Sequence, residues 1–130
     1  MDTIKLEIVS PIGPVFNGEA KSITMPGSEG EFGVLPGHAS LLALLKAGVI
    51  DIEKSNGKHE IVAINWGYAE VDETKVTILA DGAVYVGGDS ESEIKESIRK
   101  AKELLESIGS DSVSIASVVA KVEQVAKSKI

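Results

Sequence analysis

The sequence predicts an all-β domain followed by a helical hairpin. Short segments with alternating polar and apolar residues recur between turn residues up to residue 86, and the apolar period changes at Gly87-Gly88. About eight or nine such strands, spaced roughly 8 to 12 residues apart, are typical of an antiparallel sandwich or barrel. The chain has 130 residues, 43% of them hydrophobic, which is enough for one real core. We therefore predict a β-domain over residues 1–86 and a helical hairpin over residues 87–130.

The individual strands are indicated by period-2 alternation. In the first strand, Ile4, Leu6 and Ile8 share one face. Further strands are expected in the segments 15–25, 41–45, 49–53, 60–64, 65–71, 75–79 and 83–86. The apolar run 41–45 is short and lies between glycines, so it is interpreted as a buried strand. Asn56-Gly57 predicts a type I′ hairpin turn, because both residues tolerate positive φ.

A glycine-rich stretch spans residues 27–38. Four glycines and one proline in twelve residues predict a tightly shaped loop. Its apolar side chains are expected to dock on the core and its polar side chains to stay accessible, namely Phe32, Val34 and Leu35 in the first group and Glu29, Glu31 and His38 in the second. Two interpretations remain open at this point: a bulge with two turns that join strands, or a surface shaped for a partner.

Two amphipathic helices are expected after Gly88. Ser90-Glu91-Ser92-Glu93 has the form of a capping box. The apolar stripe that follows consists of Ile94, Ile98, Ala101, Leu105 and Ile108, and Gly109 suits the helix end. The second helix is rich in Val and Ser, so its stability depends on packing against the first helix, the β-domain or a foreign groove. A switchable arm is one interpretation, and a permanently folded hairpin is the simpler one.

The residues that usually carry catalysis or bind metals are scarce. The chain has no cysteine and two histidines, His38 and His59, without a metal-ligand spacing around them. No nucleophile motif or phosphate-binding loop is present, and Trp66 is interpreted as a half-buried strand residue, with a stacking platform as the alternative. The net charge of −7 argues against a nucleic-acid partner. We predict a binding or assembly module with no catalytic residues, metal or cofactor.

The N-terminus and the apolar runs bear on membrane association. Residues 1–8 show strand-like alternation and lack the apolar region of a signal peptide. No apolar run approaches the ~18 residues of a membrane-spanning helix. We therefore expect membrane association only through a partner.

Four segments resemble one protein family. The segment 30–38 resembles the Gly-x-x-Gly-Val/Ile-Leu-Pro-Gly-His signature of the bacterial-type epsilon subunit of F-type ATP synthases. The segments 5–15, 67–71 and 76–81 are similar to that family's first strand and turn, its Gly-Phe-x-Glu-Val and its Val-Thr-Ile-Leu-Ala-Asp. Order, spacing and length agree over essentially the whole chain.

This resemblance implies a ten-stranded β-sandwich with two C-terminal helices, in a non-catalytic central-stalk subunit. Such a subunit binds the gamma subunit and the c-subunit ring and turns with the rotor. It couples c-ring rotation, driven by proton flow, to ATP synthesis at the cytoplasmic face of the bacterial membrane. Its helices can extend and restrain ATP hydrolysis. The alternative is a free-standing β-sandwich adaptor with a helical docking arm.

The resemblance also implies candidate site residues. The expected rotor interface consists of Gly30, Glu31, Phe32, Val34, Leu35 and His38. The family's nucleotide-binding motif is largely altered, since Lys95, Lys100 and Val84 replace the residues expected there. ATP is therefore not expected as a regulatory ligand. Only Glu96 and Arg99 remain as candidate nucleotide contacts. The C-terminal helices are expected to contact the alpha and beta subunits. The basic side chains expected to reach the beta subunit are Lys121, Lys127 and Lys129.

Overall fold

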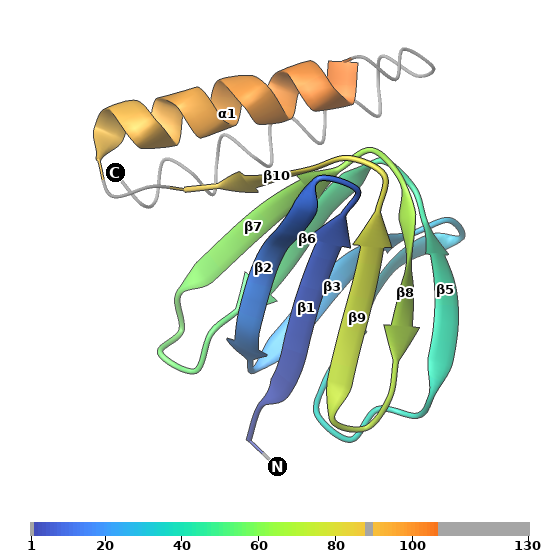
Figure 1. The fold of residues 1–130 in the computed structure, drawn as a ribbon. Coiled ribbons are helices and arrows are strands. Elements are labelled where there is room, and N and C mark those ends of the chain that lie inside the picture. Colours follow the sequence, from blue (N-terminus) through green and yellow to red (C-terminus); the bar gives the residue numbers. More distant parts are fainter. Residues whose placement is uncertain (1, 88–89, 107–130) are drawn as a thin grey trace.

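The structure is a computed structural model that describes residues 2–87 and 90–106 (Figure 1). This part of the chain contains ten strands and one helix. Their bounds are β1 (Ile4–Ser10), β2 (Gly13–Ala20), β3 (Ser22–Gly27), β4 (Gly30–Val34), β5 (Leu41–Leu45), β6 (Gly48–Glu53), β7 (His59–Ile64), β8 (Gly67–Val71), β9 (Lys75–Ala80), β10 (Ala83–Val86) and α1 (Glu91–Glu106). The predicted β-sandwich is confirmed, and the second predicted helix lies outside the described residues.

The strands form one strongly curved sheet that encloses the core. Their order is β10-β7-β6-β3-β5-β8-β9-β1-β2, and β4 pairs with β3 on its own. Most neighbouring strands are antiparallel, as predicted, and four of the pairs are hairpins of consecutive strands, whereas β1 and β9 pair in parallel. β10 also contacts β2, so the two ends of the strand order meet. The inward faces of all these strands therefore share one interior.

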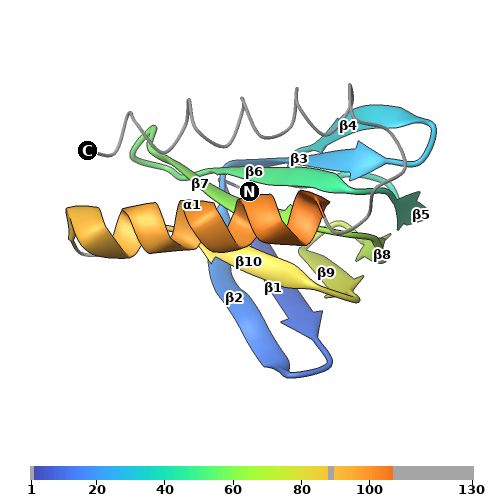
Figure 2. The same ribbon diagram turned by 90° about the horizontal axis from the view of Figure 1, so that it is seen from above.

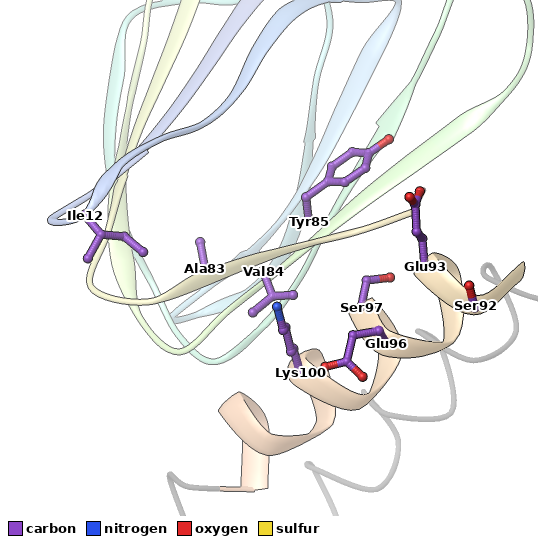
Figure 3. A pocket seen from close by; sticks show the side chains of 9 residues that line it. All are labelled: Ile12, Ala83, Val84, Tyr85, Ser92, Glu93, Glu96, Ser97 and Lys100. Carbon is purple, nitrogen blue, oxygen red and sulfur yellow. The ribbon is translucent and has the colours of Figure 1, made fainter. Parts of the chain in front are cut away.

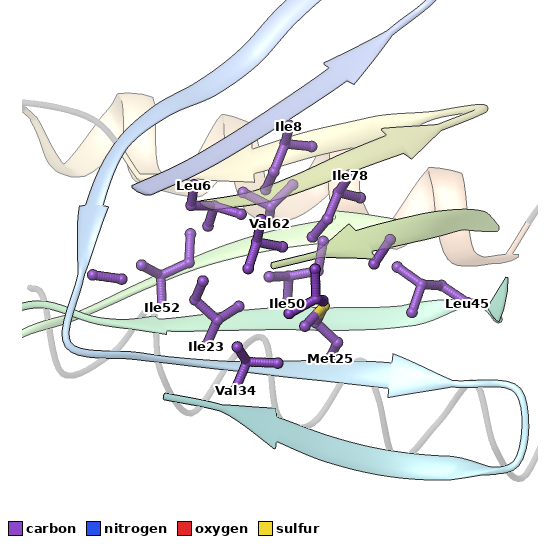
Figure 4. Close-up of a cluster of buried hydrophobic side chains, with 14 of the residues drawn as sticks. Leu6, Ile8, Ile23, Met25, Val34, Leu45, Ile50, Ile52, Val62 and Ile78 are labelled. Carbon is purple, nitrogen blue, oxygen red and sulfur yellow. The ribbon is translucent and has the colours of Figure 1, made fainter. Parts of the chain in front are cut away.

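That interior is almost entirely aliphatic. Its fully buried side chains include Leu6, Ile8, Ile23, Met25, Val34, Leu45, Ile50, Ile52, Val62 and Ile78 (Figure 4). Aromatic residues make up 4% of the sequence, so branched aliphatic side chains fill the space instead. Burial of each such side chain stabilises the fold by about 1.5–3 kcal/mol relative to exposure.

A second apolar cluster lies outside the sandwich, under α1. Figure 2 shows α1 lying along β10 on the outside of the sheet. The helix packs across β7 and β10. The sheet contributes Val49, Ile61, Ala63 and Val86, and the helix contributes Ile94, Ala101 and Leu105. We call this the covered face. The predicted cap is also confirmed, because the backbone N–H of Glu93 donates a 3.2 Å hydrogen bond to Ser90 Oγ.

The turn at Asn56-Gly57 differs from the prediction. Gly57 has φ of +83°, but Asn56 does not have positive φ, so the type I′ prediction is wrong. The Gly57 N–H donates to the Lys54 carbonyl at 2.9 Å, and the Lys54 N–H donates to the Lys58 carbonyl at 2.8 Å. This is the pattern of a longer loop, in which a turn is followed by a glycine in the left-handed region. β6 ends at Glu53 and β7 begins at His59, so the connection is too long for a two-residue turn.

The segment 15–25 was predicted as one extended unit and is two strands. β2 ends at Ala20 and β3 begins at Ser22. Between them, the Lys21 N–H donates to the Glu53 carbonyl at 2.7 Å, which directs the chain from β1 toward β6. Alternation continues across this corner, so periodicity alone does not reveal it.

Candidate functional site

The outward side of β5, β8 and β9 carries a set of exposed apolar side chains. The exposed fraction is 70% for Leu42, 59% for Leu44, 43% for Tyr68 and 41% for Leu79. We call the surface formed by these four residues the open face. Trp66, 51% exposed, directly precedes β8 and has the same strand parity as Tyr68. Contiguous exposed apolar surface of this kind is typical of a protein interaction site.

The register of the strands brings these side chains together. Leu44 lies opposite Tyr68, and Tyr68 lies opposite Leu79. Side chains directly opposite each other on antiparallel strands have Cβ atoms about 4.5–5.5 Å apart. Leu44, Tyr68 and Leu79 therefore form one continuous row across three strands. In the next row, Leu42 lies opposite Glu70.

The alternate residues of the same strands point into the core. Leu45, Ala69, Val71 and Ile78 are all buried. The prediction that 41–45 forms a strand is confirmed, but the prediction that the strand is buried is wrong, because Leu42 and Leu44 face solvent. An unbroken apolar run in an antiparallel sheet means that both faces are apolar, whereas one is usually polar. The unbroken apolar run in a sequence that predicts an antiparallel sheet was the available signal for this exposed surface, and sequence reasoning missed that signal.

Charged groups on the same side of the sheet are mostly engaged. Lys75 Nζ lies 3.6 Å from Glu7 Oε1. Asp72 Oδ1 accepts hydrogen bonds from the backbone N–H groups of Thr74 (2.9 Å) and Lys75 (2.8 Å). These bonds favour the ionised carboxylate and hold the pKa of Asp72 below its ordinary value. The side chain of Glu70 has no hydrogen bond or ion pair with any other residue that the structure describes.

The glycine-rich stretch predicted as a loop contains a strand. β4 occupies Gly30–Val34 and pairs with β3 from Ile23↔Val34 to Gly27↔Gly30. The 2.6 Å approach of the Gly30 carbonyl to a Cβ built at Gly27 leaves no room there for a side chain. A close strand pair thus explains the glycine at position 27. The register of this pair is continuous, so the predicted bulge is absent from it, and the interpretation as a surface shaped for a partner stays a prediction.

The predicted rotor-interface residues are consequently spread over three environments. Val34 is fully buried and Phe32 packs against the core, so neither presents an open surface. Gly30 and Glu31 are exposed at the start of β4. Leu35, which is 62% exposed, and His38 follow its other end, roughly 13 Å away at the usual rise per residue. The structure does not bring Glu31 and His38 into one loop.

The end that carries Leu35 and His38 is tied to the turn between β8 and β9. The Gly37 N–H donates to the Glu73 carbonyl at 2.9 Å, and Gly37 has φ of +85°. His38 Nδ1 lies 2.7 Å from the Ala39 carbonyl oxygen, which keeps the imidazole close to its own backbone. These contacts make the segment 35–38 a defined surface next to β8 and β9.

The candidate nucleotide contacts lie on α1. Arg99 Nη2 and Nε donate to Glu96 at 2.6 and 3.1 Å, and Nη1 donates to Glu103. The hydrogen bond and charge of Glu96, together with the charge of Glu103, raise the pKa of Arg99, and Arg99 in turn lowers the pKa of Glu96. Arg99 is thus an exposed helix residue paired with these two acids.

A groove of about 720 Å³ lies beside the contact between α1 and β10 (Figure 3). One wall is apolar and comes from the sandwich, and the other is polar and comes from the helix. The lining residues are Ile12, Ala83, Val84, Tyr85, Ser92, Glu93, Glu96, Ser97 and Lys100. Lys100 is the one basic side chain among them, and Arg99 is not part of the lining. The groove therefore lacks the concentration of positive charge that phosphate groups require.

Three other expectations concern a metal site, a membrane-spanning helix and the position of three lysines. Within residues 2–87 and 90–106, no group of three or more His, Cys, Asp or Glu side chains is arranged to hold a metal ion. No helix in this part of the chain has the length and apolarity needed to cross a membrane. Lys121, Lys127 and Lys129 lie outside the described residues.

Comparison with known proteins agrees with this architecture. The family profile described as "ATP synthase, Delta/Epsilon chain, beta-sandwich domain" matches residues 3–86. The ATP synthase epsilon chain of Campylobacter curvus is 60% identical over 129 residues, covering 99% of this chain and all of the relative. That of Wolinella succinogenes is 55% identical, covering 100% of this chain and 99% of the relative.

Solved structures share the fold. A chain of the Euglena gracilis mitochondrial ATP synthase, solved as the OSCP/F1/c-ring assembly, superimposes with a TM-score of 0.63 at 24% identity and covers 96% of this chain and 76% of its own length. The epsilon chain is a structural and regulatory subunit and not a catalytic one, in agreement with the prediction that this protein is not an enzyme. The sandwich, the matched profile and the full-length similarity together place the chain in the ATP synthase epsilon chain family.

Proposed function

We propose that this protein is a rotor subunit of a proton-translocating F1Fo ATP synthase that couples c-ring rotation to ATP synthesis. The observation that carries the proposal is the open face, which a monomer of this size has no reason to expose unless a partner covers it. A subunit that transmits torque must also behave as a rigid body. One sheet that closes around an aliphatic core provides that rigidity.

The partners follow from the family and from the two surfaces described above. We assign the open face to the gamma subunit, because an apolar area that stays covered is typical of a permanent interface. We assign the exposed segment 35–38 and the exposed residues at the start of β4 to contacts with neighbouring rotor parts, including the c ring. The protein then lies at the cytoplasmic face of the membrane as a peripheral component held by the complex.

The helical region carries the regulatory part of the proposal. We infer that the C-terminal helices restrain ATP hydrolysis through contacts with the alpha and beta subunits. Glu96 and Arg99 are not a nucleotide site in this proposal, because Arg99 is already bound by Glu96 and Glu103. A phosphate group would have to displace two carboxylates that lie next to its own binding position.

Assembly tests the coupling assignment. The full chain, tagged and expressed with the other synthase subunits, is expected to bring down the gamma subunit and the c ring at moderate salt. Failure to recover both would refute the rotor assignment and favour a free-standing adaptor. Recovery of gamma without the c ring would refute only the proposed c-ring contact.

Truncation tests the regulatory assignment. Deletion of residues 89–130 is expected to leave assembly intact and to change the latency of ATP hydrolysis. This deletion also removes α1 and uncovers Ile61, Ala63 and Val86, so a second truncation of 107–130 serves as the control that keeps the covered face intact. An unchanged hydrolysis rate in both truncated complexes would remove the regulatory assignment and leave the structural one.

A further inference from the structure

We propose that Glu70 is the receptor for one basic side chain of the partner that covers the open face. Glu70 is exposed and lies on β8 with Tyr68 two residues before it on the same side of the sheet. Leu42 on β5 lies directly opposite Glu70 on one side, and Thr77 on β9 lies opposite it on the other side. The carboxylate therefore borders the row formed by Leu44, Tyr68 and Leu79.

Two other carboxylates on this side of the sheet already have partners. Glu7 pairs with Lys75, and Asp72 accepts two backbone N–H groups of its own turn. Glu70 makes no such contact with the described residues. Lys75, the basic residue of β9, pairs with Glu7 and forms no ion pair with Glu70. Within the described residues, the Glu70 charge is thus unpaired at the border of an apolar surface.

Docking changes the environment of this charge. A partner that covers Leu42, Leu44 and Tyr68 excludes water from their border, and a carboxylate deprived of water without a counter-charge costs several kcal/mol. A basic side chain placed against Glu70 removes that penalty and gains a charge-assisted hydrogen bond. Arginine suits the position best, because its planar guanidinium donates two parallel hydrogen bonds to a carboxylate and tolerates apolar neighbours.

The proposed contact therefore specifies the chemistry of the partner. Apolar side chains of the partner meet Leu44, Tyr68 and Leu79, and one arginine or lysine beside them meets Glu70. Apolar contacts account for the area, and the single charge pair fixes the register in which the two surfaces meet. This inference rests on the proposed function, which assigns the open face to the gamma subunit.

The test compares two carboxylates on the same side of the sheet. E70Q keeps the shape of the side chain and removes its charge, and E7Q does the same at a carboxylate that already has Lys75. We expect E70Q to weaken binding of the full chain to an F1 subcomplex containing alpha, beta and gamma by roughly tenfold or more. E7Q is expected to bind like the wild type. E70K should weaken binding further, because it places two cations together.

Salt dependence and folding complete the experiment. Binding of the wild type should weaken with salt more steeply than binding of E70Q, since the variant has lost the charge pair. Thermal unfolding should be unchanged in E70Q, because the Glu70 side chain is exposed and has no hydrogen bond or ion pair with the described residues. Binding of E70Q equal to or tighter than that of the wild type would overturn the charge pair alone. Absence of wild-type binding to the subcomplex would overturn both this inference and the proposed function.

Discussion

The sandwich has two apolar surfaces on its outside, and the chain covers one of them itself. On the covered face, Ile61 and Ala63 of β7 are completely buried beneath α1. On the open face, Leu42 and Leu44 of β5 remain 70% and 59% exposed. Both surfaces break the usual rule that the outer side of an antiparallel sheet is polar. The difference lies in what the chain supplies to cover each of them.

The same sequence pattern has two different structural consequences on the two faces. β7 and β5 both contain uninterrupted apolar runs, Ile61–Ile64 and Leu41–Leu45. At β7 the second apolar side stabilises the fold, because a helix of the same chain packs on it. At β5 the second apolar side stays largely exposed in the described structure, and it is available for association. Substitutions on the two faces should therefore affect different measurements.

The largest effect is expected from Ile61→Ala on the covered face. Removal of a fully buried isoleucine from beneath α1 should lower the free energy of unfolding by about 3 kcal/mol, from lost burial and the cavity left behind. Urea denaturation of the purified chain measures this change. Leu44→Ala is the matched control and should change it by no more than about 0.5 kcal/mol. Equal losses in the two variants would contradict the distinction between the faces.

The next largest effect is expected on association. Leu42→Glu combined with Leu44→Glu should weaken binding to the gamma-containing subcomplex by roughly 100-fold, because two carboxylates would replace the apolar centre of the open face. Titration calorimetry measures the affinity, and circular dichroism of the free variant should match the wild type. Unchanged affinity would show that the open face is not the gamma interface.

A smaller effect is expected at the start of α1. Ser90→Ala removes the oxygen that accepts the Glu93 N–H and should destabilise the helix by about 1 kcal/mol. Faster amide exchange should appear in α1 and in the β7 amides beneath it, whereas β5 and β8 should exchange as in the wild type. Faster exchange in all of these strands would show that the helix and the sandwich unfold together.

The smallest effect is a pH dependence at the turn beside the open face. The backbone N–H groups of Thr74 and Lys75 lower the pKa of Asp72 in the folded state, so its contribution to stability is present above the unfolded value of 3.8 and is lost as the pH falls through the folded pKa. Asp72→Ala should therefore be less stable than the wild type at neutral pH and converge with it in acid. Urea midpoints across this pH range measure the difference, and a gap that persists in acid would contradict it.

Local patterns were sufficient for most elements of the fold. Alternation at Ile4, Leu6 and Ile8 indicated a strand, and Ser90 followed by Glu93 indicated the start of a helix. Both follow from short-range backbone geometry and hydrogen bonding. The motif in segment 30–38 was also sufficient for the family resemblance, because a resemblance depends on the order of the residues and not on the conformation of the segment.

Long-range pairing decided what local patterns left open. Glycines at positions 27, 30 and 33 suit a loop equally well as a close strand pair, and the pairing of β3 with β4 selected the strand. That strand moved Glu31 and His38 to opposite ends of one element. In the same way, the run 41–45 does not reveal whether its second apolar side has a cover, because the cover is a different segment or a different protein.

Strand-forming segments, the helix start and the membership of the ATP synthase epsilon chain family were thus encoded in the order of the residues. The identity of the surface that a partner meets was decided by the fold. Only the register of β5, β8 and β9 places Leu44, Tyr68 and Leu79 in one row with Glu70 at its border. These residues are far apart in sequence, and only tertiary packing shows which apolar side chains the protein leaves uncovered.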